Sequence, residues 1–171
     1  MIPFILMLLI YKRFIIMDIT NLFIGGQAVD DRGTVSFVND FDFNNVKRFY
    51  QVENHRRGFI RAWHGHKKEG KYVYVPSGTA LVGAVPMPDY WYNDEVGAEV
   101  EVSKKEWPKT FILSSKLPKV LYIPPDHCNG FMNLEENTIV QFFSTSTLEE
   151  SLGDDKRFDY DTWNIWEEDY R

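Results

Sequence analysis

The sequence has only one cysteine, Cys128, among its 171 residues. A single thiol forms no internal disulfide, so the fold must depend on its hydrophobic core, and a reducing cytoplasm is the predicted location. Long apolar runs are also missing. The apolar opening segment is interrupted by Lys12 and Arg13, whereas a helix that crosses a bilayer needs roughly 20 apolar residues. The sequence therefore predicts no membrane partner.

Residues 1–16 do not have the features of a secretory signal. A signal peptide carries its positive charge before the apolar run and a small-residue cleavage site after it, and neither is present. We predict a mis-assigned start with Met17 as the first residue, or else an extension that touches a membrane or packs on the core. Residues 17–171 are long enough to bury the core of one domain.

A basic surface is absent as well. The net charge is −6, and the segment 149–171, with nine acidic and three basic side chains, accounts for all of it. Nucleic-acid binding requires a basic face that releases counterions, so this class of partner is excluded. The basic side chains of residues 56–71 suit a smaller anion such as a diphosphate, which needs only a few well-placed cations.

Aromatic residues make up 16% of the chain, and many alternate with polar residues in short runs between Gly, Pro, Asn or Asp. This pattern is typical of β-strands. The predicted strands lie within 33–41, 47–52, 58–66, 71–78, 79–85, 99–104, 109–115, 119–125, 130–134 and 138–145. About ten short strands with few helices predict an all-β sandwich or barrel.

The acidic C-terminal tail carries aromatic residues at Tyr160, Trp163, Trp166 and Tyr170. We predict an extended or short helical segment whose aromatic rings pack on the barrel while its acids face water.

Two of the four histidines, His64 and His66, are one residue apart. Residues two apart in a strand point to the same face, so both rings can share one ligand. With Glu69 and the later segment IPPDHCNGF, the order resembles the cupin superfamily, whose fold is a jelly-roll barrel. Where a metal-binding cupin has its last histidine, this chain has Asn129, so a metal-dependent cupin is only an alternative.

Several blocks of sequence, in order, resemble the dTDP-4-dehydrorhamnose 3,5-epimerase family of cupins. They are VDDRGTVSF, GFIRAWHGH, EGKYVYVPSG, LSSKLPKVLYIPPDHCNGFMNLEENTIVQFFSTST and FDYDTWNIW. VKRFYQV followed by RAWHGHKK is similar to the dTDP-4-keto-6-deoxyhexose 3,4-ketoisomerases. The resemblance implies a homodimer that uses no metal or other cofactor. It also implies a nucleotide-diphosphate 4-keto sugar as substrate, in deoxysugar and polysaccharide biosynthesis.

The chemistry of such a substrate suits these residues. A proton beside a ketone is removed by a base with a pKa near neutrality, which imidazole provides, and His64 is the candidate base. By resemblance, Arg61 and Lys71 face the charge that develops on the carbonyl oxygen, and Arg32 contacts the diphosphate. Asn129 is also assigned to substrate binding.

Three features complicate the epimerase interpretation. The tyrosine that returns the proton in this family falls on Phe142, and the aspartate that holds the base has no clear counterpart; Asp159, Asp161 and Asp169 are possible replacements. Arg61 and His64 are three apart, so they share a face only across a bulge or strand end.

Four alternatives follow from these departures. One is a single-site epimerase, and another is an isomerase that uses His64 and His66 as a proton-moving pair beside Tyr50. The third is a sugar-binding module without catalysis. In the fourth, His64 is a hydrogen-bonded core residue with no role in catalysis.

Overall fold

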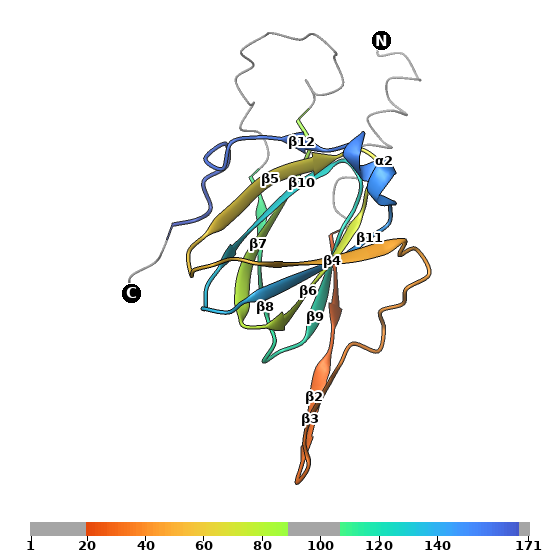
Figure 1. Ribbon diagram of the computed structural model, residues 1–171, viewed down its shortest axis with the longest axis vertical. Coiled ribbons are helices and arrows are strands. Elements are labelled where there is room, and N and C mark those ends of the chain that lie inside the picture. The colour runs from red at the N-terminus through yellow and green to blue at the C-terminus, as the bar shows by residue number, and fades with distance from the viewer. Residues whose placement is uncertain (1–19, 89–106, 168–171) are drawn as a thin grey trace, which may run out of the picture.

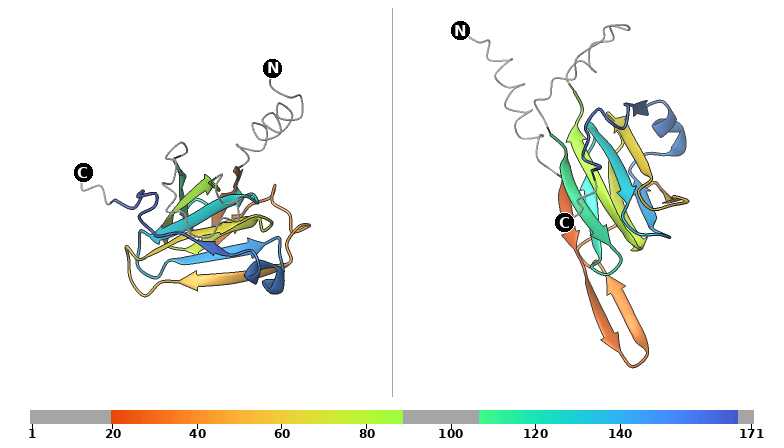
Figure 2. Two further views of the ribbon diagram at one scale, coloured as in Figure 1. Left: turned by 90° about the horizontal axis from the view of Figure 1, so that it is seen from above. Right: turned by 90° about the vertical axis from the view of Figure 1, so that its left-hand side faces the viewer.

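The computed structural model describes residues 20–88 and 107–167. In this part of the chain, two five-stranded antiparallel sheets lie face to face (Figures 1 and 2). The predicted all-β jelly roll is therefore confirmed. Residues 1–16 and the strand predicted at 99–104 fall outside the described residues.

The first sheet has the strand order β1-β9-β6-β11-β4. Its strands are β1 (Asn21–Ile24), β9 (Lys119–Ile123), β6 (Lys71–Ser77), β11 (Ile139–Ser144) and β4 (Arg48–Glu53). Alternate residues point inward, as strand geometry requires. In β11, for example, Val140, Phe142 and Ser144 are buried, whereas the residues between them are partly exposed.

The second sheet has the order β12-β5-β10-β7-β8. Its strands are β12 (Lys156–Arg157), β5 (Ile60–His66), β10 (His127–Asn133), β7 (Thr79–Pro86) and β8 (Lys109–Ser114). Leu113, Val82 and Phe131 from this sheet pack against Val73 and Phe142 from the first sheet in one core cluster. Burial of this apolar area is the main stabilising term of the fold.

A hairpin of β2 (Gly26–Asp30) and β3 (Gly33–Phe37) stands apart from both sheets. It projects from the barrel as a separate two-stranded arm (Figures 1 and 2). All residues of β3, and all but the first of β2, are exposed.

The C-terminal tail covers the outer face of the second sheet. It begins with the short helix α2 (Leu148–Leu152), capped by Thr147 and Glu150 in a reciprocal capping box. Trp163 and Trp166 are buried against Trp63 of β5, with ring centroids 5.4 and 5.1 Å from its own. The prediction of a tail that packs through its aromatics is right for both tryptophans and wrong for Tyr160, which is 57% exposed and contributes its carbonyl oxygen instead. Tyr170 lies outside the described residues.

Gly83 of β7 makes room for this aromatic layer. A Cβ atom at this position would lie 2.5 Å from a ring carbon of Trp63, closer than van der Waals contact allows.

Among the described residues, no helix combines the length and apolar character that a membrane crossing requires.

Trp163→Ala should destabilise the fold because it removes a buried ring from the layer over β5. We expect a loss of about 3 to 5 kcal/mol in the free energy of unfolding, measured by urea titration. The matched control is Trp107→Ala, since Trp107 is 63% exposed and should change stability by no more than about 0.5 kcal/mol. Equal effects of the two variants would show that the tail does not stabilise the sheet.

Candidate active site

Strand β5 carries the two histidines on the inner face of its sheet. His66 pairs with His127 and His64 pairs with Asn129, but the next pair is Arg61 with Phe131. Three steps along β5 therefore match two steps along β10, which is a β-bulge. Because Phe131 points into the core, the bulge returns Arg61 to the same face as His64. This arrangement resolves the parity problem seen in the sequence.

His64 is a partly exposed histidine held by a carboxylate. Its side chain is 35% exposed, and its Nδ1 lies 3.3 Å from Oδ1 of Asp155. Burial lowers the pKa of His64, the hydrogen bond to Asp155 opposes this effect, and the pKa stays below the ordinary value of 6.5. The imidazole is therefore neutral at pH 7. With its proton on Nδ1 facing Asp155, Nε2 keeps a lone pair for a substrate proton.

Asp155 is a site residue that the sequence analysis missed. Burial raises its pKa, but hydrogen bonds from Arg157 and His64 outweigh this effect, so the pKa lies below 3.8 and the side chain is a carboxylate. The tail brings it to His64 because β12 pairs with β5, Arg157 opposite His64. Asp159 and Asp161, the residues suggested for this role, are exposed, and Asp169 lies outside the described residues. A run of acids in a tail gives no signal of which one folds back onto a strand.

The neighbouring acid, Asp154, holds the backbone of the turn after β5. Its carboxylate accepts hydrogen bonds from three consecutive backbone N–H groups, those of Lys67, Lys68 and Glu69, at 2.8–3.2 Å. These groups belong to the turn that follows His66. The pair Asp154 and Asp155 thus fixes both the end of β5 and the ring of His64.

His66 differs from His64 in being almost fully buried, at 3% exposure. Its Nε2 lies 2.9 Å from Nζ of Lys71, a buried lysine at the start of β6. Burial, and then the charge of Lys71, lowers the pKa of His66 to about 4. The predicted shared face of the two histidines is present, but His66 is engaged by protein groups, so its ring is not available as a base in the way that His64 is.

Lys71 is buried beside two acidic groups. Burial lowers its pKa, whereas the carboxylates of Glu69 and Asp155 raise it, with a net decrease from 10.5. Its positive charge also lowers the pKa of His64. The structure therefore places a buried lysine close to the candidate base.

Tyr50 of β4 faces the interior from the opposite sheet. It stacks on Phe142, with centroids 5.0 Å apart and planes 12° from parallel, and the guanidinium of Arg48 covers its ring at 5.0 Å. Burial, followed by the negative charge of Glu69, raises the pKa of Tyr50 well above 10. Its hydroxyl is consequently protonated at neutral pH, next to the phenylalanine that has no proton to give.

The three remaining predicted residues, Asn129, Arg61 and Arg32, differ in how they are placed relative to His64. Asn129 is buried, and its amide donates to the carbonyl oxygen of His64 at 3.0 Å, so it holds the strand that carries the base. Arg61 is on the same face but exposed, with Nε 2.7 Å from Oδ1 of Asn54. Arg32 is 85% exposed in the arm and pairs with Asp30, so this chain does not bring it to His64.

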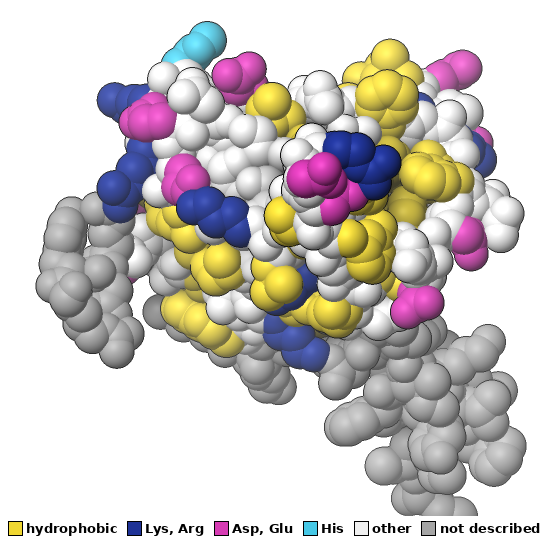
Figure 3. Space-filling model, turned by 90° about the horizontal axis from the view of Figure 1, so that it is seen from below, with side chains coloured by type: hydrophobic (Ala, Val, Ile, Leu, Met, Phe, Trp, Pro, Cys, Tyr) yellow, Lys and Arg dark blue, Asp and Glu magenta, His cyan; other side chains and the backbone are white. Residues whose placement is uncertain are grey.

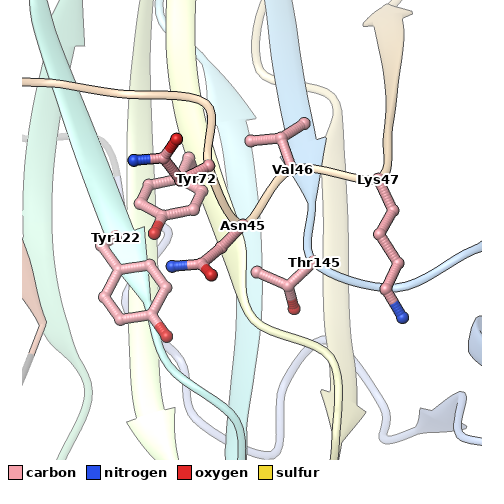
Figure 4. A pocket seen from close by; sticks show the side chains of 7 residues that line it. Asn45, Val46, Lys47, Tyr72, Tyr122 and Thr145 are labelled. Carbon is pink, nitrogen blue, oxygen red and sulfur yellow. The ribbon is translucent and has the colours of Figure 1, made fainter.

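Two further observations define the limits of the site. Within the described segments 20–88 and 107–167, no three His, Cys, Asp or Glu side chains converge to hold a metal ion. A hollow of about 380 Å³ lies on the outer face of the first sheet, between residues 44–47 and the rings of Tyr72 and Tyr122 (Figure 4). It is separate from the histidines, which face the inside.

Comparisons with known proteins agree with this architecture. No family model and no curated protein matches the sequence. Among solved structures, the chain is similar to ChmJ, a 3'-monoepimerase from Streptomyces bikiniensis, with a TM-score of 0.68, 13% identity and coverage of 89% of this chain and 76% of that chain. It is also similar to the QdtA 3,4-ketoisomerase from Thermoanaerobacterium thermosaccharolyticum, with a TM-score of 0.59, 20% identity and coverage of 83% of this chain and 88% of that chain.

The chain is similar to a third solved structure, the dTDP-4-dehydrorhamnose 3,5-epimerase from Sulfolobus tokodaii, with a TM-score of 0.59, 24% identity and coverage of 81% of this chain and 77% of that chain. The fold is thus that of the dTDP-sugar epimerases and ketoisomerases, and the resemblance inferred from sequence blocks is confirmed at the level of the fold.

Asp155→Asn should lower the pKa of His64 further, because the carboxylate is the group that raises it. NMR titration of the His64 ring should therefore give a lower midpoint in the variant than in the unmodified protein. Asp159→Asn, which removes an exposed acid of the same tail, is the matched control and should leave the midpoint unchanged. A higher midpoint in Asp155→Asn would contradict the pairing.

Proposed function

We propose that this protein is an epimerase of a dTDP-4-keto-6-deoxy-hexose, in which His64 removes a proton from the carbon beside the ketone. The observation that carries the proposal is the dyad of His64 and Asp155 on the inner wall of the barrel, with the cation Lys71 nearby. The fold shared with dTDP-sugar enzymes supports the substrate class.

The reaction follows from the protonation states of three groups. Nε2 of His64 takes the proton, and the electrons of the C–H bond move through the new C=C bond to the carbonyl oxygen, which becomes an enolate. Lys71 stabilises this negative charge by its own positive charge. When the carbonyl forms again, a donor on the opposite face of the sugar returns a proton to the same carbon, and solvent restores both groups.

We propose Tyr50 as this donor. In related epimerases the sequence resemblance implies a tyrosine at the position of Phe142, and here the hydroxyl is supplied by the next strand, from a ring stacked on that phenylalanine. His64 and Tyr50 belong to opposite sheets. A base and an acid on opposite walls suit inversion of one carbon.

The rival function is 3,4-ketoisomerisation, which moves the ketone to a neighbouring carbon. A ketoisomerase of this sequence would use His64 and His66 as a proton-moving pair. The contact of His66 Nε2 with Lys71 leaves one free base instead of two, which favours the epimerase.

The test is solvent exchange in D₂O with dTDP-4-keto-6-deoxyglucose, followed by NMR. We expect deuterium at C3 or C5 with the ketone retained at C4; a ketone at C3 would establish the ketoisomerase, and no exchange would leave a binding module. His64→Asn should reduce exchange by about 10² to 10⁴-fold. Tyr50→Phe should retain exchange but lose inversion, because it removes the donor and keeps the base.

We propose further that the protein is a homodimer in the cytoplasm, with a role in deoxysugar supply for polysaccharide biosynthesis. The lone thiol of Cys128 is buried and free, which suits a reducing compartment.

The projecting arm of β2 and β3 supports the proposal of a dimer. Val29 and Val35 in it are 74% and 64% exposed, and Phe43 and Phe49 on the body are 60% and 66% exposed. Seen from below, the molecule has several groups of exposed hydrophobic side chains (Figure 3), and such patches mark interfaces.

In this dimer the arm would bring Arg32 to the diphosphate of the substrate bound by the second copy. Val29→Asp with Val35→Asp should then give a monomer in light scattering and also raise KM. Arg32→Ala is the matched variant. It should raise KM by about tenfold or more, the value of one charge-assisted contact, while the dimer remains. A dimer that survives the double substitution, or an unchanged KM in Arg32→Ala, would refute this role of the arm.

A further inference from the structure

Glu69 is a fully buried carboxylate that the proposed reaction does not use. It follows β5, and its side chain has 0% exposure. Ser144 of β11 donates its hydroxyl at 2.6 Å, and Ser151 of α2 donates at 2.7 Å. Arg48 of β4 adds Nη2 at 3.2 Å. A buried charge is costly unless it is paired and hydrogen-bonded, and donors from three other segments of the chain, β4, β11 and α2, surround this one.

The same carboxylate faces His66 and Lys71. Its Oε2 lies 3.0 Å from Nδ1 of His66 and 4.0 Å from Nζ of Lys71. Nδ1 is buried and makes no hydrogen bond among the described residues, and the charged groups near it are the carboxylates of Glu69 at 3.0 Å and Asp154 at 3.9 Å. The acid and the lysine are thus on two sides of one imidazole ring.

The order of these groups fixes the proton of His66. A charged ammonium has three donors and no acceptor, so His66 must accept from Lys71 with Nε2 at 2.9 Å. Its proton is then on Nδ1, which lies 3.0 Å from Oε2 of Glu69. Moving this proton to Nε2 would set a donor against the ammonium. The negative carboxylate and the positive lysine therefore favour the same tautomer.

We propose that Glu69 is a positioning residue, which keeps Lys71 charged and directed toward the reacting oxygen through His66. This inference rests on the proposed function, in which Lys71 stabilises the enolate. Without the carboxylate, Lys71 would lose the largest of the charges that raise its pKa and would keep the repulsion of Arg48, so the neutral amine would be more favoured. The charged and titratable groups that face Glu69 or Lys71 are Arg48, Tyr50, His64, His66, Asp154 and Asp155.

Glu69→Gln tests the role of the charge with little change in shape. In the unmodified protein, kcat/KM for solvent exchange falls at high pH when Lys71 loses its proton. In Glu69→Gln this alkaline fall should move to lower pH by about one to three units, the usual effect of one opposite charge at 4–6 Å. The acidic fall, set by His64, should move much less.

Two variants of α2 serve as references. Glu149→Gln removes an exposed acid two residues from Ser151 and should leave the profile unchanged. Ser151→Ala keeps the carboxylate but removes one of its donors, so it should move the alkaline fall by less than Glu69→Gln does. It also provides the test if Glu69→Gln does not fold. An alkaline fall unchanged in both site variants would overturn the proposal.

A second measurement does not depend on the substrate. Two-bond ¹H–¹⁵N NMR spectra of the free protein should show His66 with its proton on Nδ1, and Glu69→Gln should shift the proton toward Nε2. If His66 already carries the proton on Nε2 in the unmodified protein, the proposal is wrong. Absence of solvent exchange in the unmodified protein would reject the proposed function, whereas the tautomer would still decide whether Glu69 controls this pair.

Discussion

The position of β5 between two neighbours is the constraint on which the site depends. On one edge it pairs with β10, and on the other with the short strand β12. Its outer face is covered by the tail through Trp63, whose backbone exchanges two hydrogen bonds with Phe158. With both edges and one face fixed, the ring of His64 can vary little in direction, and a base must be held in this way to act on one particular C–H bond.

The interior of the barrel is divided into an apolar and a polar part. Val82, Leu113 and Val140 belong to a continuous hydrophobic cluster, whereas Glu69 and Lys71 are buried on either side of the uncharged ring of His66. Buried ion pairs add little net stability, because desolvation offsets their attraction. Their presence here, satisfied by serine hydroxyls and Arg48, is explained better by the chemistry of the site than by the stability of the fold.

The tail joins structure and chemistry. Its tryptophans bury the outer face of the second sheet, and the residues before them supply Ser151 to Glu69, Asp154 to the turn after β5, and Asp155 to His64. A segment that the composition marks only as acidic and aromatic thus completes the site. Docking of the tail and orientation of the base are consequences of the same contacts.

The sequence by itself determined the strands and the face that the histidines share. Short runs of β-branched and aromatic residues between turn residues identified β3 to β11 in the described part of the chain, although β10 begins at His127 instead of residue 130, and β1, β2 and β12 were missed. The period of two placed His64 and His66 together, since it is a local property of a strand. The resemblance of several sequence blocks to the epimerase family identified the fold.

Only the tertiary structure decided the partners. Asp155 is 91 residues from His64, and the bulge that returns Arg61 to the inner face is visible only in the register with β10. The unequal roles of His64 and His66 depend on Lys71 and Glu69 around one ring. Contacts between distant segments and the burial of charge arise when the sheets close, so no local pattern records them.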